Sequence, residues 1–173
     1  AVSYVNANPV LIDVNENWDI NLKDLENSIS EHTKAIIIPH LYGIPSKIKH
    51  IIDFCKENNI YIIEDCAEAH GAKEGDFYVG SQGDVACFSF YANKHITTGE
   101  GGAVLTDSQE LYDLMKQIIN LDFKEPNRFN HKNLYWNYRI SGIQASLGIS
   151  QINSLNKTIN LKIKQGEAYN QLF

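Results

Sequence analysis

Apolar and polar positions along the chain form blocks that predict short strands separated by helices. Continuous apolar runs favour strands, and they lie at residues 10–14, 34–39, 60–63, 84–90 and 103–106. The run at 34–39 ends in proline and is typical of a strand that is buried on both faces. Strands that alternate with helices predict an α/β fold with a mainly parallel sheet flanked by helices.

Between these runs, apolar residues recur at helical spacing. Helices are expected at residues 21–30, 46–57, 107–119 and 141–173. Ser46 is the expected N-cap of the second helix, and Asp107 with Glu110 resembles a capping box for the third. Residues 121–136 are polar and aromatic without a period, which indicates a loop. The last segment forms one helix or two, with Gly148 or Asn156 as the possible break.

Composition excludes several function classes. The 173 residues predict one domain, and the net charge of −6 argues against non-specific binding of nucleic acid. No apolar run approaches the ~20 residues of a membrane helix. No signal peptide is recognisable, and the odd number of cysteines in apolar context predicts reduced thiols in a cytoplasmic protein.

The most informative segment is 87–102, which reads CFSFYANKHITTGEGG. Lys94 follows an apolar strand there, and a lysine at the mouth of a buried strand is costly unless its amine is used, for example as a Schiff base. Asp65 ends an earlier strand, and parallel sheets gather ligands at that edge. A buried aspartate keeps a pyridine nitrogen protonated. The pair favours a pyridoxal phosphate site, although each residue alone is typical of a surface or turn.

Several motifs together resemble the DegT/DnrJ/EryC1/StrS family of sugar aminotransferases. The segments that carry this resemblance are PHLYG at 39–43, IIEDCAEAHGA at 62–72, GSQGD at 80–84, FSFYANK at 88–94, TTGEGG at 97–102 and NYR at 137–139. The resemblance covers essentially the whole chain and implies the large domain of a fold type I, aspartate aminotransferase-like, pyridoxal phosphate enzyme.

The resemblance also implies a role for each matching residue. Lys94 would bond to the cofactor aldehyde and shuttle the proton, and Asp65 would pair with the pyridine nitrogen. Glu68 would contact the ring hydroxyl, and Ser89 would bind the phosphate. Asn137 would reach the phosphate of a neighbouring subunit, which implies a homodimer with shared active sites.

Within the family, the sequence is most similar to the perosamine synthetase group. This implies amination at C4 of a nucleotide-linked 4-keto-6-deoxy sugar for surface polysaccharide such as O-antigen, with glutamate as donor and 2-oxoglutarate as its product. The alternatives are amination at C3, a UDP- or dTDP-linked sugar, or a catalytically silent interaction module. One branch of the family has histidine at the lysine position and is a dehydratase, but Lys94 here favours transamination.

Other residues have two interpretations. His40, Tyr91 and His95 are candidates for the sugar pocket, but packing roles explain them equally well. A zinc site is a weaker alternative, because its four soft ligands lack a Cys-x-x-Cys knuckle. Those ligands would be Cys66, His70, Cys87 and His95.

Members of the family are about twice as long as this chain. We therefore expect a large domain that is truncated at both ends, so that apolar faces and sheet edges stay open. We expect the isolated 173-residue chain to be weakly stable and nearly inactive, with the aminotransferase activity belonging to the intact parent protein. Residues 1–155 are assigned to the cofactor-binding large domain, and residues 156–173 to a helix that leads toward a C-terminal small domain.

Overall fold

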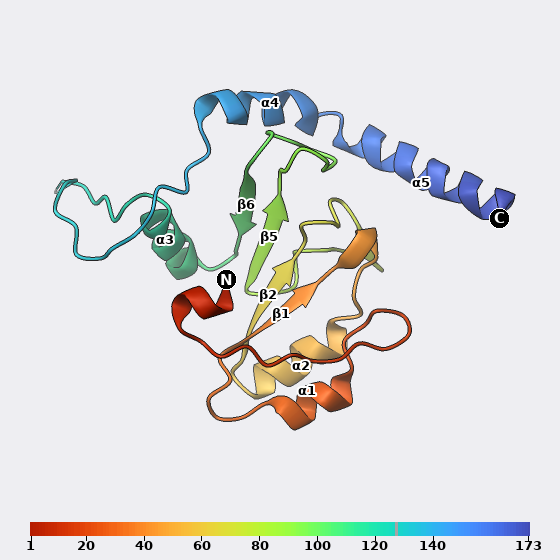
Figure 1. Cartoon of the computed structure of the whole chain (residues 1–173), viewed down its shortest axis with the longest axis horizontal. Coiled ribbons are helices and arrows are strands. Elements are labelled where there is room, and N and C mark those ends of the chain that lie inside the picture. Colours follow the sequence, from red (N-terminus) through yellow and green to blue (C-terminus); the bar gives the residue numbers. More distant parts are fainter. Residues whose placement is uncertain (127) are drawn as a thin grey trace.

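A four-stranded sheet forms the centre of the computed structural model, which describes residues 1–126 and 128–173 (Figure 1). The strands lie in the order β1 (Ala35–Pro39), β2 (Tyr61–Asp65), β5 (Val85–Ser89) and β6 (Gly102–Leu105). The first three are parallel, and β6 runs antiparallel to β5. The mainly parallel α/β sheet that the sequence predicts is confirmed, with one antiparallel strand at its edge.

Helices and a small hairpin surround this sheet. The helices are α1 (Leu22–Ser28), α2 (Lys49–Glu57), α3 (Gln109–Ile118), α4 (Gly142–Ile152) and α5 (Leu155–Leu172). Two short 3-10 helices span Val2–Val5 and Leu41–Gly43, and the hairpin pairs β3 (Lys73–Glu74) with β4 (Phe77–Tyr78). No helix in the described part of the chain is both long and apolar enough to cross a membrane.

The main core lies between α1, α2 and one face of β1 and β2. Ile36, Ile38 and Ile62 project from the strands into this core, where they meet Ile51 and Cys55 of α2. Alternate residues point to the other face of the strands. That face is open at Ile37, which is 43% exposed, so the prediction that β1 is buried on both faces is wrong for this chain.

Strand register brings three loops to one edge. Pro39 of β1 pairs with Asp65 of β2, and Asp65 pairs with Cys87 of β5. The chain therefore leaves all three parallel strands at the same carboxyl edge. The loops that begin at His40, Cys66 and Phe90 become neighbours there.

Three local expectations are wrong. Residues 10–13 form no strand, and Val14 makes only an isolated bridge to Ile20. Ser46 does not cap α2, because its hydroxyl donates to the Pro39 carbonyl at 2.9 Å and the helix begins later. The N-cap of α3 is Ser108, whose side chain accepts from the Leu111 N–H, so the capping box is absent.

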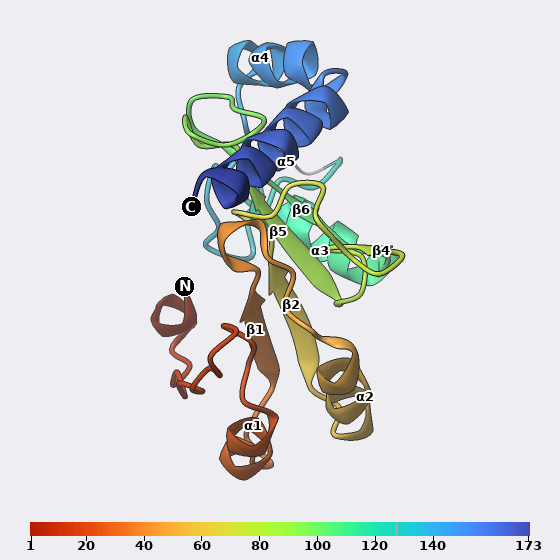
Figure 2. The ribbon, with the colours of Figure 1, turned by 90° about the vertical axis from the view of Figure 1, so that its right-hand side faces the viewer.

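The C-terminal segment forms two helices that lie beyond the carboxyl edge of the sheet (Figure 1, Figure 2). The break lies at Asn153 and Ser154, and not at either residue that the sequence favours. Gly148 lies inside α4, and a Cβ there would meet the Thr98 methyl group at 3.0 Å. The glycine therefore serves the close approach of α4 to the loop after β5.

Candidate functional site

The carboxyl edge of the sheet carries the three residues that the sequence predicts to bind the cofactor most directly. Asp65 is the last residue of β2, Ser89 is the last residue of β5, and Lys94 follows in the loop after β5. All three are half-buried. Because Asp65 pairs with Cys87, the carboxylate and the hydroxyl come from adjacent strands at nearly the same level.

The loop that carries Lys94 is closed at its base. The Phe90 carbonyl accepts from the Thr98 N–H at 2.9 Å and from the Thr97 hydroxyl at 3.1 Å. Gln151 of α4 holds the same loop, because its side chain accepts from the Thr97 N–H and donates to the Thr97 carbonyl at 2.8 Å. The lysine is thus presented from an anchored loop.

Glycines make the return to β6 possible. Gly101 has a φ of +148°, a backbone conformation that other residues rarely adopt. A Cβ on Gly102 would lie 2.6 Å from the Phe88 carbonyl oxygen. The Gly-Glu-Gly-Gly motif therefore lets β6 pass close to β5 directly beside Ser89.

Three polar groups at this edge keep hydrogen-bonding capacity that no partner uses within residues 1–126 and 128–173. The Lys94 amine makes no hydrogen bond or ion pair there. Asp65 uses Oδ1 to accept from the Ala67 N–H at 3.1 Å, which leaves Oδ2 available. The Ser89 hydroxyl accepts from the Tyr91 N–H at 3.2 Å and retains its proton for another acceptor. An amine, a carboxylate oxygen and a hydroxyl donor are therefore available to a ligand.

Glu68 lies between the first two of the three loops. Its Oε2 accepts from the backbone N–H of Tyr42 at 3.0 Å, so it joins the loop after β1 to the loop after β2. Its other carboxylate oxygen has no partner among the described residues.

Glu64 is the residue that sequence reasoning missed. Its carboxylate is fully buried and accepts from His40 Nε2 at 3.0 Å and from the N–H groups of Gly80, Gln82 and Gly83 at 2.8, 2.9 and 2.6 Å. It thereby ties β1 and β2 to the loop before β5. A carboxylate in an otherwise apolar strand was the available signal, because a buried charge needs partners.

Opposing effects act on Glu64. Burial alone would raise the pKa of this carboxyl, but the hydrogen bonds from His40, Gly83, Gly80 and Gln82 outweigh burial and hold the pKa below its usual range. Glu64 therefore remains an anion that accepts four hydrogen bonds.

His40 is the partner of Glu64 and has no nitrogen left for a substrate. Its Nδ1 accepts from the Ser46 N–H at 3.0 Å, so the ring proton lies on Nε2 and is donated to Glu64. The ring is 2% exposed. The sugar-pocket role considered for His40 gains no support from these contacts.

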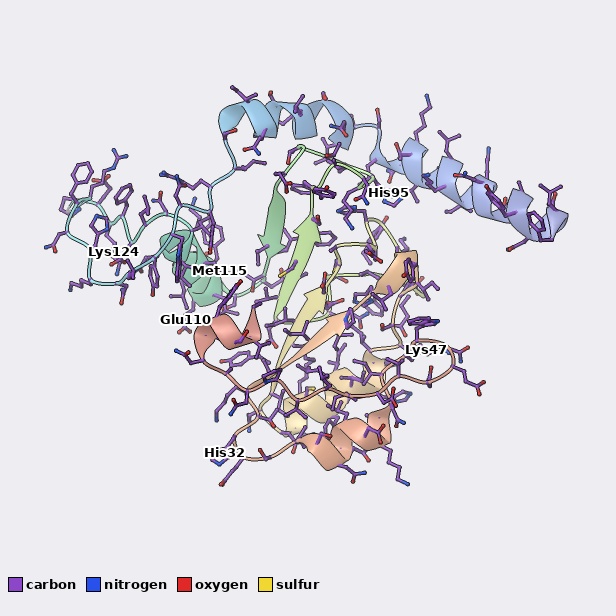
Figure 3. The ribbon with its side chains drawn as sticks, in the orientation of Figure 1. His32, Lys47, His95, Glu110, Met115 and Lys124 are labelled. Atoms are coloured by element: carbon purple, nitrogen blue, oxygen red, sulfur yellow. The ribbon has the colours of Figure 1, made fainter. Side chains whose placement is uncertain are left out.

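His70 and His95 meet next to the lysine loop. The two rings lie edge to face with centroids 5.9 Å apart, and His70 also stacks on Phe88 and Phe90. Burial lowers the pKa of His70, and the nearby His95 and Lys94 lower it further. Burial, Lys162 and Lys94 likewise lower the pKa of His95, which Figure 3 shows at the edge of the sheet beside α5. Both imidazoles are therefore held neutral.

The remaining candidates are Tyr91, whose backbone adjoins Ser89 and Lys94, and Asn137, which lies on the segment after α3. Tyr91 is exposed at the start of the lysine loop. Asn137 is exposed and pairs with Asn120 in an isolated bridge, and its Oδ1 accepts from Arg139 Nε at 2.9 Å. Asn137 does not approach Lys94 closely enough for any hydrogen bond within the described part of the chain.

The four residues considered for zinc do not converge. In the described chain, the tight group of potential metal ligands consists of His40, Glu64 and Cys66. The proton on His40 Nε2 already bridges to Glu64, which explains this group as a hydrogen-bonded cluster. Burial raises the pKa of the Cys66 thiol to about 12, and the charges of Glu64 and Asp65 act in the same direction.

The chain is an α/β protein with a mainly parallel sheet, and an amine, a carboxylate and a hydroxyl lie at the carboxyl edge of that sheet. In proteins of this class, ligands bind beyond the carboxyl ends of the strands. The description "DegT/DnrJ/EryC1/StrS aminotransferase family" belongs to the family model that matches residues 1–173. The chain belongs to this family. Its members depend on pyridoxal phosphate.

Curated relatives agree with the family. GDP-perosamine synthase of Escherichia coli O157:H7 is 38% identical over 98% of this chain and 47% of its own length. GDP-perosamine synthase of Vibrio cholerae is 35% identical over 94% and 45%. A UDP-N-acetyl-3-dehydro-alpha-D-glucosamine 3-aminotransferase of Acidithiobacillus ferrooxidans is 37% identical over 84% and 39%. The chain thus spans about half the length of the curated relatives that it matches.

Solved structures share the fold. A DegT DnrJ EryC1 StrS aminotransferase from Brucella abortus superposes with a TM-score of 0.91 at 28% identity, over 98% of this chain and 48% of that one. A Streptococcus pneumoniae protein solved in its PLP form gives 0.82 at 26% identity, over 90% and 45%. The predicted fold type and the predicted family are both confirmed.

Proposed function

We propose that this chain forms the cofactor-binding part of a pyridoxal phosphate-dependent aminotransferase that acts on a nucleotide-linked sugar. The observation that carries the proposal is the set of available groups at one sheet edge, Lys94, Asp65 and Ser89. Their chemistry fits the cofactor, which needs an amine for its aldehyde, an anion for its ring nitrogen and donors for its phosphate. When bound, pyridoxal phosphate supplies an electron sink that stabilises a carbanion.

Each residue then has a defined task. With the cofactor bound, Lys94 Nζ would hold its aldehyde carbon, with the aldehyde oxygen leaving as water, and would then accept and return protons as a general base. Asp65 Oδ2 would hold the proton of the ring nitrogen, and Ser89 Oγ would donate to the phosphate. Glu68, whose Oε2 accepts from the Tyr42 N–H, would contact the ring hydroxyl. The closed loop and Gln151 would hold the backbone that presents the Lys94 amine.

For the substrate, we propose a GDP-linked 4-keto-6-deoxy sugar that is aminated at C4, with glutamate as donor and 2-oxoglutarate released. The GDP-perosamine synthases among the relatives support this choice. Amination at C3 of a UDP-linked sugar is the second candidate, and the Acidithiobacillus 3-aminotransferase supports it at nearly the same identity. The product would serve surface polysaccharide such as O-antigen, and the enzyme would work in the cytoplasm.

We also propose a homodimer in which Asn137 completes the partner's site. Asn137 lies far along an exposed segment that follows α3, with Tyr138 66% exposed beside it. In the same proposal, residues 1–155 belong to the large domain, and residues 156–173 lead to a small domain.

Borohydride reduction tests the cofactor site. The chain is mixed with pyridoxal phosphate, reduced, digested and mapped by mass spectrometry. The expected adduct lies on Lys94 and is absent from Lys94→Ala, whereas Lys73→Ala, which removes an exposed lysine beside Tyr78, retains it. An adduct elsewhere, or none, would contradict the proposal and favour a silent module.

Substrate choice needs a second experiment. The intact parent protein, loaded with pyridoxal phosphate, is offered GDP-, UDP- and dTDP-linked keto sugars with glutamate, and the aminated product is identified by mass spectrometry and NMR. A product aminated at C4 of the GDP-sugar is expected. A preference for a C3 ketone would support the second candidate instead.

A further inference from the structure

Two exposed aromatic residues at the carboxyl edge hold backbone conformations that bulky residues avoid. Trp18 has a φ of 65° and Tyr42 a φ of 54°. Left-handed φ values are uncommon outside glycine, asparagine and aspartate, and strained residues of this kind cluster at ligand sites. The two side chains remain 56% and 78% exposed, so burial of apolar surface does not account for their conformation.

Local hydrogen bonds hold Trp18 in place. The Asn15 side chain accepts from the N–H groups of Asn17 and Asp19, and its carbonyl accepts from the Trp18 N–H at 3.0 Å. Asp19 Oδ1 accepts from the Lys47 N–H at 3.1 Å, which fastens this turn to the loop after β1; Figure 3 shows Lys47 there. The indole is therefore presented from a turn that is ordered without it.

Tyr42 is held in the same way. Its N–H donates to Glu68 Oε2 at 3.0 Å, and Gly43 follows with a φ of +79°. The two rings meet edge to face with centroids 6.5 Å apart and an angle of 88° between their planes. Both residues line a small cavity of about 30 Å³ together with Pro45 and Ser46. An edge-to-face pair leaves ring faces open to a third planar group.

The position of this pair fits one end of an elongated ligand. Tyr42 follows β1, whereas Ser89 ends β5, and β2 lies between the two strands. Two strand spacings amount to about 10 Å. A nucleotide-linked sugar carries its base on the far side of a ribose and two phosphates from the reacting carbon. With the sugar at Lys94, the base would lie near the aromatic pair.

We propose that Trp18 and Tyr42 form the subsite for the planar base of the nucleotide-linked sugar, an inference that rests on the proposed function. Bases stack on aromatic side chains whatever their identity. The subsite therefore supplies affinity for a nucleoside diphosphate, and choice among bases has to come from other contacts.

Intrinsic fluorescence tests the subsite, because the chain contains only Trp18 and Trp136. Trp136→Phe leaves Trp18 as the single reporter. Titration of the pyridoxal phosphate-loaded variant with GDP, UDP or dTDP is expected to quench its emission, whereas inorganic pyrophosphate is expected to leave it unchanged. Quenching by pyrophosphate alone, or by none of these ligands, would overturn the inference.

A second variant removes the Trp18 ring and keeps the backbone conformation of its turn, so that a change in binding can be distinguished from a change in folding. Glycine suits a left-handed position, so Trp18→Gly removes the ring without straining the turn. We expect the Kd for GDP, measured by calorimetry, to rise about tenfold, as loss of one stacked base predicts. Asn59→Gly is the matched control, because Asn59 has a φ of 53° and lies after α2 at the opposite edge of the sheet. Trp18→Phe is expected to restore most of the affinity.

The two proposals fail in different ways. An unchanged Kd in Trp18→Gly, with a borohydride adduct still on Lys94, overturns the subsite and leaves the proposed function intact. Absence of the adduct overturns the proposed function whatever the fluorescence shows.

Discussion

At the scale of single residues, Glu64 and Asp65 show how neighbouring carboxylates acquire different roles. Successive strand residues point to opposite faces. Glu64 accordingly points into the interior, where four N–H groups surround its carboxylate, whereas Asp65 keeps one oxygen available at the ligand edge. One carboxylate thus organises the loops, and the other is left for chemistry.

Glu64→Gln is expected to lower the free energy of unfolding by about 2 kcal/mol, because an amide places a donor against donors in a buried site. Urea denaturation measures this loss. Glu57→Gln, on the exposed side of α2, is the control and should change the midpoint little. If both variants have the same urea midpoint, the buried Glu64 carboxylate does not stabilise the fold more than the exposed Glu57 carboxylate does.

Glu64 also predicts how stability depends on pH. Its pKa is lowered in the folded chain, so its contribution is fully present above the unfolded pKa of about 4.3 and is lost as the pH falls through the folded pKa. Unfolding midpoints of the native sequence should therefore decline as the pH is lowered below about 4.3 and on through the folded pKa. Glu64→Gln should show a shallower fall, and an identical slope would refute this assignment.

At the scale of elements, the connection between β5 and β6 shapes the site. The Phe90 carbonyl accepts hydrogen bonds from Thr97 and Thr98 at the far end of the loop that Phe90 begins. Gln151 of α4 donates a further hydrogen bond to this loop. Gly102 then pairs opposite Ser89. The position of the Ser89 hydroxyl thus depends on the absence of a side chain at Gly102, across the strand pair.

Gly102→Ala is expected to cost about 1–3 kcal/mol, because its Cβ would press on the Phe88 carbonyl and force β6 away from β5. The fraction of this variant that binds pyridoxal phosphate, measured by visible absorbance, should also be lower than in the native chain. Gly166→Ala is the matched control, since nothing lies within 4 Å of its added Cβ, and helix propensity predicts a small gain in α5. Equal effects in both variants would contradict this account.

Periodicity predicted elements whose pattern is local. The strands at β1 and β2 and the helix with Ile51, Ile52 and Cys55 on one face were found because their own residues carry the signal. The strand expected at residues 10–14 was wrong, because a strand needs a neighbour and only Val14 found one. Ser46 was misassigned because its partner, Pro39, lies across a loop.

At the scale of the whole molecule, the strand ends could be placed from topology, whereas contacts between distant loops could not. Lys94, Asp65 and Ser89 follow from the rule that parallel strands end together. The hydrogen bonds that Glu64 accepts from Gly80, Gln82 and Gly83 join segments whose approach no local pattern predicts. Trp18 and Tyr42 were missed for the same reason, since their pairing spans two separate loops.

The apolar surfaces of α4 and α5 lead to a prediction for the whole chain. Large side chains on these helices are more than half exposed, namely Ile143, Leu147, Ile149, Ile152, Leu161 and Ile163. The native chain should therefore bind the dye ANS. Ile149→Ser with Leu161→Ser should lower dye fluorescence while changing the free energy of unfolding by less than about 0.5 kcal/mol.

Ile38→Ser is the contrasting variant, because this side chain is fully buried. It should unfold the chain more readily and increase dye binding. The surface interpretation fails if the double variant on α4 and α5 loses stability to the same extent.

The hydrogen bond between Phe90 and Thr98 limits how far the Lys94 amine can reach. With both ends of its loop anchored, the Lys94 amine can sweep only the sphere described by its own four-carbon stem. A ligand that bonds to this amine would therefore have to come within that sphere, because the loop is tied at both ends.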